Sequence, residues 1–306
     1  MRDAILKDWS MATAASLALY VTGFALPVLT LPTTLIYPLP AVFLAFGRGF
    51  FCSLTSTLLA SLLAGGALLG SYGITCFFMF GLPGVLIGYI ADKCEKSGSL
   101  LVASASVGFA CKLAGGLILY SFFGFNLLAP GAAELEGYLN YFGVPADPAV
   151  TRAIVDRAIL LVPYNMIFFS TVESVVCLLL TSAIQKKRTG EAFFVLPPFS
   201  EWAFPKNILF TLVVGFICAR MAKGREDLYL LRLMGANLSE LSRTILAVQG
   251  LSCACFFMER FGVPKPFRIA VIISTPFISL LGSIWVTVGL TDIGFNVRDK
   301  IGRILR

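Results

Sequence analysis

Long apolar stretches separated by short polar segments make up most of this chain. A transmembrane helix needs about 20 mostly apolar residues, because the hydrocarbon core of a bilayer is about 30 Å thick. By this criterion we predict membrane spans near residues 11–31, 33–47, 50–70, 73–91, 100–123, 158–184, 206–222, 237–260 and 267–290. The predicted fold class is all-α, a polytopic transmembrane helical bundle of eight or nine spans.

Two of these segments depart from the pattern of plain spans and short loops. The stretch 33–47 is short and contains Pro38 and Pro40, which predicts a broken or partly re-entrant segment. The longest loop runs from Gly124 to Arg157, and residues 132–142 and 148–158 within it are candidates for short amphipathic helices. This loop is either a lid over an outward cavity or an ordinary interfacial loop.

Only two ionisable side chains lie deep inside any predicted span, Lys112 in 100–123 and Glu173 in 158–184. A charge at this depth costs roughly 2.5–3.5 kcal/mol on insertion scales, so it persists only with a partner or a function. At 1.5 Å per residue, both side chains lie roughly 18–20 Å from the same membrane boundary. We therefore predict that Lys112 and Glu173 can pair across two antiparallel helices.

This candidate intramembrane pair has two interpretations. A buried ion pair can fix the register of two helices without contributing much stability. Alternatively, Lys112 and Glu173 form the polar floor of a ligand cavity, or Glu173 is a carboxylate coupled to an ion. Both interpretations stay open at the level of sequence.

Composition agrees with a membrane protein and excludes other classes. Of 306 residues, 58% are hydrophobic and 13% are charged, and the mean hydropathy is +0.86. Soluble domains carry about 25% charged residues. The net charge of +7 is spread over short loops, so we expect no nucleic-acid partner and predict contact with the lipid bilayer. The first apolar stretch is interpreted as a retained span, because no cleavable signal peptide is recognisable.

The residues needed for common catalytic and metal sites are missing. Histidine is absent and no C-x-x-C pair occurs among the eight cysteines, so we expect no metal and no cofactor. Walker A, H-E-x-x-H and G-x-S-x-G sequences are also absent, so we predict no catalytic residues and no enzymatic activity. Asp92 and Asp292 lie at span ends, where a capping or interfacial role is expected.

The distribution of lysine and arginine predicts the orientation of the first six spans. A cytoplasmic N-terminus also places Arg48, Lys93 and Lys96 in the cytoplasm, together with the cluster 186–188. The last third fits this rule poorly with three further spans. One alternative is that one of the nine stretches does not cross, which gives eight spans and an internal C-terminal tail. The predicted count therefore stays at eight or nine.

Small residues recur at the spacing that lets transmembrane helices approach closely. These motifs are Gly66-xxx-Gly70, Gly84-xxx-Gly88, Ala14-xxx-Ala18, Ala41-xxx-Ala45 and Ala60-xxx-Ala64. They indicate either packing inside the bundle or docking of a partner membrane protein. Docking is most plausible for the Ala-rich first span.

A segment rich in proline and aromatic residues runs from Phe193 to Lys206 and reads FFVLPPFSEWAFPK. Its prolines prevent a regular helix, and its aromatic side chains suit the headgroup level, so we predict a stiff cytoplasmic connector on the membrane surface. A wider pattern of candidate family motif residues includes Pro197, Pro198, Phe199, Trp202, Pro205, Asn237, Gln249 and Asp292.

This pattern, continued by Phe295 and Arg298, resembles the YybS-like family of bacterial integral-membrane proteins, a domain of unknown function. That family is distantly similar to the substrate-binding (S) components of energy-coupling-factor transporters. The resemblance implies a single integral-membrane domain over 1–306 in the bacterial cytoplasmic membrane, with a six-span core over 1–190. Residues 191–306 then form the connector and accessory spans, which the S components lack.

The resemblance implies that the protein is the substrate-binding membrane component of a small-molecule, vitamin-like importer. The first span, with Ala12, Ala14, Ala15 and Ala18, would dock a membrane coupling subunit. The alternative is a non-transporting membrane scaffold in envelope assembly or signalling, in which the Lys112–Glu173 pair is structural and the small-residue faces bind other membrane proteins.

Overall fold

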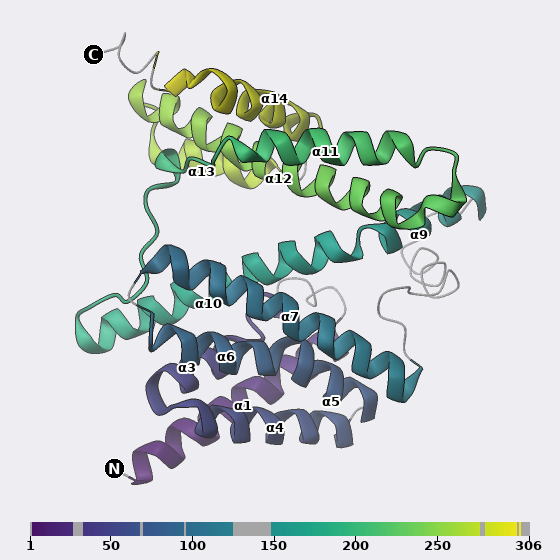
Figure 1. Ribbon diagram of the computed structural model, residues 1–306. Coiled ribbons are helices and arrows are strands. Elements are labelled where there is room, and N and C mark those ends of the chain that lie inside the picture. Colours follow the sequence, from purple (N-terminus) through teal and green to yellow (C-terminus); the bar gives the residue numbers. More distant parts are fainter. Residues whose placement is uncertain are drawn as a thin grey trace. The chain divides into compact units, whose positions relative to one another are not determined.

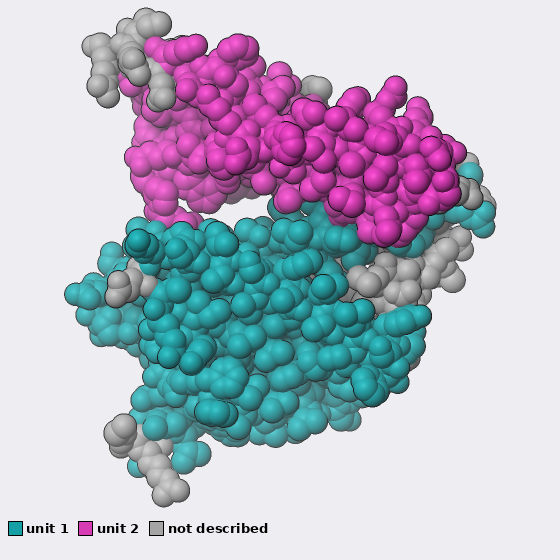
Figure 2. Space-filling view, in the orientation of Figure 1, with its two compact units in different colours: residues 1–195 teal, residues 196–306 magenta. Residues whose placement is uncertain are grey.

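The computed structural model describes residues 2–26, 33–67, 70–94, 96–124, 148–275, 279–298 and 300, and every regular element within them is helical (Figure 1). The chain divides into two compact units, Met1–Val195 and Leu196–Arg306, called unit 1 and unit 2 (Figure 2). The predicted division at residue 190 lies close to this boundary, and the assignment to one domain stays a prediction.

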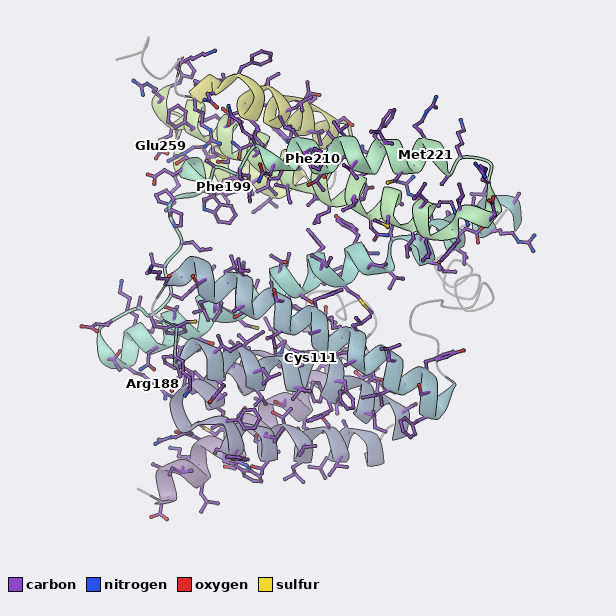
Figure 3. The ribbon with its side chains drawn as sticks, viewed as in Figure 1. Cys111, Arg188, Phe199, Phe210, Met221 and Glu259 are labelled. Atoms are coloured by element: carbon purple, nitrogen blue, oxygen red, sulfur yellow. The ribbon has the colours of Figure 1, made fainter. Side chains whose placement is uncertain are left out.

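Unit 1 consists of helices that follow the predicted apolar stretches. Its elements are α1 (Arg2–Ala25), α3 (Leu39–Arg48), α4 (Phe50–Ala67), α5 (Gly70–Cys76), η1 (Phe77–Gly81), α6 (Leu82–Ala91), α7 (Ser97–Phe123), α9 (Pro148–Leu160) and α10 (Val162–Thr189). α10 ends with Gly190 at a φ of +87°, a left-handed conformation that glycine adopts without a steric penalty. Basic residues in its last turn, Arg188 among them, complement the helix dipole (Figure 3).

α5, η1 and α6 form one continuous helix of 22 residues, Gly70–Ala91. Its middle segment, η1, is π-helical. Pro83 follows shortly after, and a proline removes the hydrogen bond to the residue four positions earlier and crowds that carbonyl. That residue is Met79, which lies within η1, so the wider π turn accommodates the proline without ending the helix.

Two of the predicted small-residue motifs pack against each other inside unit 1. A Cβ atom on Gly84 would lie 2.6 Å from the Pro38 carbonyl oxygen, and one on Gly88 would lie 2.7 Å from the Ala45 Cβ. The backbones of α3 and α6 are therefore in direct contact. Gly66 and Gly70 differ, because a Cβ on either would meet no described atom within 4 Å.

An aromatic cluster holds α1 against the following helices. Tyr20 and Tyr37 are almost fully buried and meet edge to face, with ring centroids 5.5 Å apart. Phe80 contacts Tyr37 in the same way at 4.7 Å. Ala60 and Ala64 complete the cluster from α4, where their small side chains leave room for the rings. The opposite face of α1 is exposed and carries Ala14, Ala15 and Ala18.

Unit 2 is built around one long helix. Its elements are η2 (Phe199–Glu201), α11 (Asn207–Met221), η3 (Glu226–Leu228), α12 (Tyr229–Arg260), α13 (Lys265–Ser274) and α14 (Ser279–Phe295). α12 packs against α11, α14 and η2. A Cβ on Gly215 would touch Ser239, and one on Gly235 would touch Ala219, so α11 and α12 form an antiparallel hairpin.

Four predicted spans lie on helices long and apolar enough to cross a membrane: Gly70–Ala91, Ser97–Phe122, Val162–Thr189 and Tyr229–Arg260. The stretches 33–47, 50–70 and 206–222 lie on shorter apolar helices. α3, at ten residues, is about 15 Å long and does not cross on its own.

The predicted span 267–290 falls on α13 and α14, and residues 276–278 between them lie outside the described residues. The count of eight or nine spans stays a prediction. The candidate helix 132–142 also lies outside the described residues, whereas 148–158 corresponds to α9.

Candidate functional site: two buried polar centres

Lys112 and Glu173 form an ion pair between α7 and α10. The Lys112 Nζ donates to the Glu173 Oε2 at 2.5 Å. The two residues are 6% and 3% exposed. The structure thus brings together the two charges whose matching depth suggested a pair, close to Cys111 on the same helix (Figure 3).

Small side chains allow the two helices to approach near this pair. A Cβ on Gly108 would lie 3.2 Å from the Ser170 Cβ, one turn before Glu173. Ser174 bonds back to the Ser170 carbonyl at 2.7 Å, and Cys177 donates to the Leu35 carbonyl at 3.6 Å. Three cavities in the described parts of the chain are lined by residues other than Lys112 and Glu173. The pair is therefore a direct side-chain contact between α7 and α10.

A second polar centre lies in unit 2, where Asp292 of α14 meets Gln249 of α12. The Gln249 Nε2 donates to the Asp292 Oδ2 at 2.5 Å, and the two residues are 3% and 5% exposed. Arg298, just beyond α14, donates from Nε to the same carboxylate oxygen at 2.8 Å and from its backbone nitrogen to Oδ1 at 3.2 Å. Asp292 was expected to have a capping or interfacial role, and the structure instead buries it in an ion pair.

The guanidinium of Arg298 also binds the connector. Its Nη1 donates to the Ser200 carbonyl at 3.0 Å and to the Ser252 hydroxyl at 3.2 Å, and its Nη2 donates to the Trp202 carbonyl at 2.8 Å. The Ser252 hydroxyl lies 2.7 Å from the Phe199 carbonyl and can donate its proton there. We call this set of contacts the Arg298 clasp. It joins η2, α12 and the end of α14.

Most of the predicted motif residues meet at this clasp. The Trp202 indole donates to the Pro197 carbonyl at 3.0 Å and packs against Phe199, which lies on the connector (Figure 3). The backbone nitrogen of Phe204 donates to the Gln249 Oε1 at 2.9 Å. Pro198 precedes the turn of η2.

Two motif residues do not belong to the clasp: Pro205, which lines the cavity described below, and Asn237. Asn237 lies in the other half of α12 and donates to the Leu233 carbonyl at 2.7 Å. Sequence reasoning included Arg298 in the family pattern without assigning it a partner, and it missed Ser252. The opposite charges of Asp292 and Arg298 are a sequence signal for their pairing. Ser252 has no such signal, because it is one of many serines in apolar helices.

A cavity of about 420 Å³ opens beside the clasp. Gln249 and Asp292 line it as buried side chains, whereas Glu201 and Lys206 line it as exposed ones. Pro205 and two aromatic residues supply apolar walls. The arrangement offers a few fixed polar groups beside apolar surface, which is the usual composition of a small-molecule site. Among the described residues, no group of three or more His, Cys, Asp or Glu side chains is placed to hold a metal ion.

Comparison with known proteins identifies a family but no individual similar protein. A search of curated proteins and a search of solved structures gave no match. These comparisons give no evidence of a similarity to energy-coupling-factor S components. The model of one family, described as Predicted membrane protein (DUF2232), matches residues 14–293, which is most of both units. The chain belongs to this family of predicted membrane proteins, whose function is unknown.

Proposed function

We propose that this membrane protein binds a small polar solute in the unit 2 cavity and serves as the solute-binding component of an importer. The observation that carries the proposal is a cavity of about 420 Å³ lined by two buried polar side chains, Gln249 and Asp292. Small-molecule sites have volumes of about 300–1,000 Å³ and a few convergent polar groups.

The Lys112–Glu173 pair has a different role in this proposal. Its two charges neutralise each other, and both are almost completely buried. A ligand would have to break a short ion pair between two packed helices to reach either side chain. We therefore assign this pair to helix register, and the solute site to unit 2.

An importer component also needs a partner that drives transport. The exposed face of α1 carries Ala14, Ala15 and Ala18, and small residues let a second transmembrane helix approach closely. The same face favours the second candidate function, a non-transporting scaffold for other membrane proteins. Cross-linking from a cysteine at position 15, followed by identification of the captured protein, separates the two. An ATPase-linked coupling subunit supports the importer, and envelope-assembly or signalling proteins support the scaffold.

The solute site is tested by native mass spectrometry of the full-length protein purified in mild detergent. Ala203 is exposed and lines the cavity, so Ala203→Trp fills the space without removing a polar contact. Ala270→Trp, on the exposed surface of α13, is the matched control. We expect a co-purified small molecule in the wild type and in Ala270→Trp but not in Ala203→Trp. A wild type without any bound solute, or a solute that Ala203→Trp retains, contradicts the proposal.

A further inference from the structure

The guanidinium of Arg298 lies in a receptor made entirely of hydrogen-bond acceptors. These are one oxygen of the Asp292 carboxylate, the carbonyl oxygens of Ser200 and Trp202, and the hydroxyl oxygen of Ser252. Asp292, Ser200 and Ser252 are 5%, 8% and 0% exposed. Buried acceptors without a donor are costly, and a buried carboxylate without a positive partner is more so. The Ser252 hydroxyl also lies 2.9 Å from the Trp202 carbonyl and can donate to it. The Asp292 carboxylate and the Ser200 carbonyl are therefore the acceptors that most favour a cation with several N–H groups.

The receptor and its occupant come from different parts of unit 2. The connector, α12 and α14 supply the acceptors, whereas Arg298 lies beyond the end of α14. The chain leaves that helix through Asn296, whose φ is +51°, a left-handed conformation that asparagine tolerates better than most residues. Arg298 is thus held on a short extension of α14, and the helices that form the receptor do not themselves carry the cation.

The cavity reaches the same carboxylate. Asp292, Arg298, Glu201 and Lys206 all line it. Without Arg298, the residues that line the cavity carry two carboxylates, on Glu201 and Asp292, and one ammonium group, on Lys206. The charge of the empty receptor is therefore negative, which favours a positively charged ligand over a neutral or anionic one.

We propose that the unit 2 cavity takes a cationic solute of the guanidinium or primary-amine class, and that Arg298 occupies its receptor as a tethered competitor. This inference rests on the proposed function and names the chemical class of the solute. The solute enters when Arg298 leaves the Asp292 carboxylate. The N–H groups of the solute then donate to the carbonyls of Ser200 and Trp202 in place of Arg298.

The test uses the full-length protein in detergent, with methylguanidinium chloride at millimolar concentration as the probe. Methylurea, which has the same shape but no charge, is the control ligand. Isothermal titration calorimetry on the wild type should give weak, saturable binding of methylguanidinium that Ala203→Trp abolishes and Ala270→Trp keeps. Arg298→Ala should bind at least tenfold more tightly, because the competitor is gone, and Arg298→Ala/Asp292→Asn should lose this gain.

Several results overturn the inference. Equal binding of methylurea and methylguanidinium removes the charge argument. Arg298→Ala that binds methylguanidinium no more tightly than the wild type does means that Arg298 is a structural clasp and not a competitor. If Arg298→Ala does not fold, the comparison of wild type, Ala203→Trp and Ala270→Trp still decides. A co-purified solute that is neutral or anionic refutes the cation class but leaves the solute site intact, whereas a wild type that binds neither solute nor probe refutes both proposals.

Discussion

At the residue scale, the molecule contains two buried ion pairs with different surroundings. Lys112 and Glu173 pair side chain to side chain within 2.5 Å. Asp292 and Arg298 also pair, but Arg298 has further partners on the connector and on α12. A buried pair gains little over an apolar pair of the same volume, whereas removing one partner leaves an uncompensated charge. Both pairs should therefore be sensitive to loss of one partner, and loss of Arg298 also removes hydrogen bonds to the connector and to α12.

The first prediction concerns the Lys112–Glu173 pair. Lys112→Met or Glu173→Leu alone should lower the free energy of unfolding by about 3–5 kcal/mol, because one buried charge loses its partner. The double variant Lys112→Met/Glu173→Leu should recover most of this loss. Thermal unfolding in detergent measures the stability of the single and double variants, with the exposed Lys187→Met as the control. Single variants as stable as the wild type would show that the pair does not hold α7 to α10.

The second prediction concerns the clasp. Arg298→Lys keeps the charge beside Asp292, but a lysine ammonium lacks the planar fork that reaches two carbonyls and a hydroxyl at once. The connector around Ser200 and Trp202 should then be cleaved several-fold faster in limited proteolysis. Arg243→Lys, on the exposed side of α12, is the matched control. Unchanged cleavage in Arg298→Lys would mean that the Asp292 pair alone fixes the connector.

At the scale of elements, glycine contacts determine how closely the helices pack. In unit 2, the side-chain position of Gly250 faces the backbone of Trp285, and that of Gly289 faces the backbone of Leu246. α12 and α14 thus meet through backbone atoms, which cannot rotate away as a side chain can. Gln249 and Asp292 lie beside these glycines, so the close approach is also what brings the two polar side chains together.

The third prediction follows from this contact. Gly289→Ala should destabilise unit 2 by about 1–3 kcal/mol or more, because a methyl group there overlaps the Leu246 carbonyl. Gly282→Ala, on the same helix with no described atom within 4 Å of its Cβ position, should be nearly neutral or slightly stabilising. Thermal unfolding compares the two. Equal stability of both variants would contradict the close approach of α12 and α14.

The helices themselves follow from hydropathy, whereas their contacts follow from it only in part. The spacing of Gly84 and Gly88 indicated close packing, and they pack on Ala41 and Ala45. Gly250 and Gly289 lie one on each helix, 39 positions apart, so the sequence does not show that these two glycines lie at one contact. The hydrogen bonds of the clasp could not be predicted from the sequence either. Four of its acceptors are backbone carbonyls or hydroxyls, whose pairing depends on tertiary structure and not on residue type.

At the scale of the whole molecule, the α11–α12 hairpin constrains the orientation of unit 2. The connector contacts α12 at Gln249 and Ser252, and the hairpin turn precedes Tyr229. From Tyr229 to Gln249 the helix rises about 30 Å, the thickness of the hydrocarbon core. The connector and the turn at Arg225 therefore lie at opposite ends of a membrane-spanning length. The distribution of basic residues favours the cytoplasmic side for both the connector and the turn. The length of the helix between them instead places them on opposite sides of the membrane.

The fourth prediction follows the helix length and places position 225 outside the cell and position 201 in the cytoplasm. With the native cysteines replaced, a single cysteine at position 225 should react with a membrane-impermeant maleimide on intact cells. A cysteine at position 201, in η2, should react only after permeabilisation. Both positions are exposed in unit 2, so accessibility alone does not separate them. If both positions react on the same side, the hairpin does not cross the membrane and the charge rule holds for this unit.

The Arg298 clasp also has a consequence for the order in which the protein is assembled during synthesis. The Ser200 carbonyl and its Arg298 partner are 98 positions apart, and Trp202 and Arg298 are 96 apart. At about 5–20 residues per second, a ribosome needs roughly 5–20 s to make the intervening chain. Gln249 and Ser252 reach the connector first, and Arg298 arrives last. The Ser200 carbonyl therefore lacks its Arg298 donor during this time, and the clasp closes only after α12 and α14 have been made.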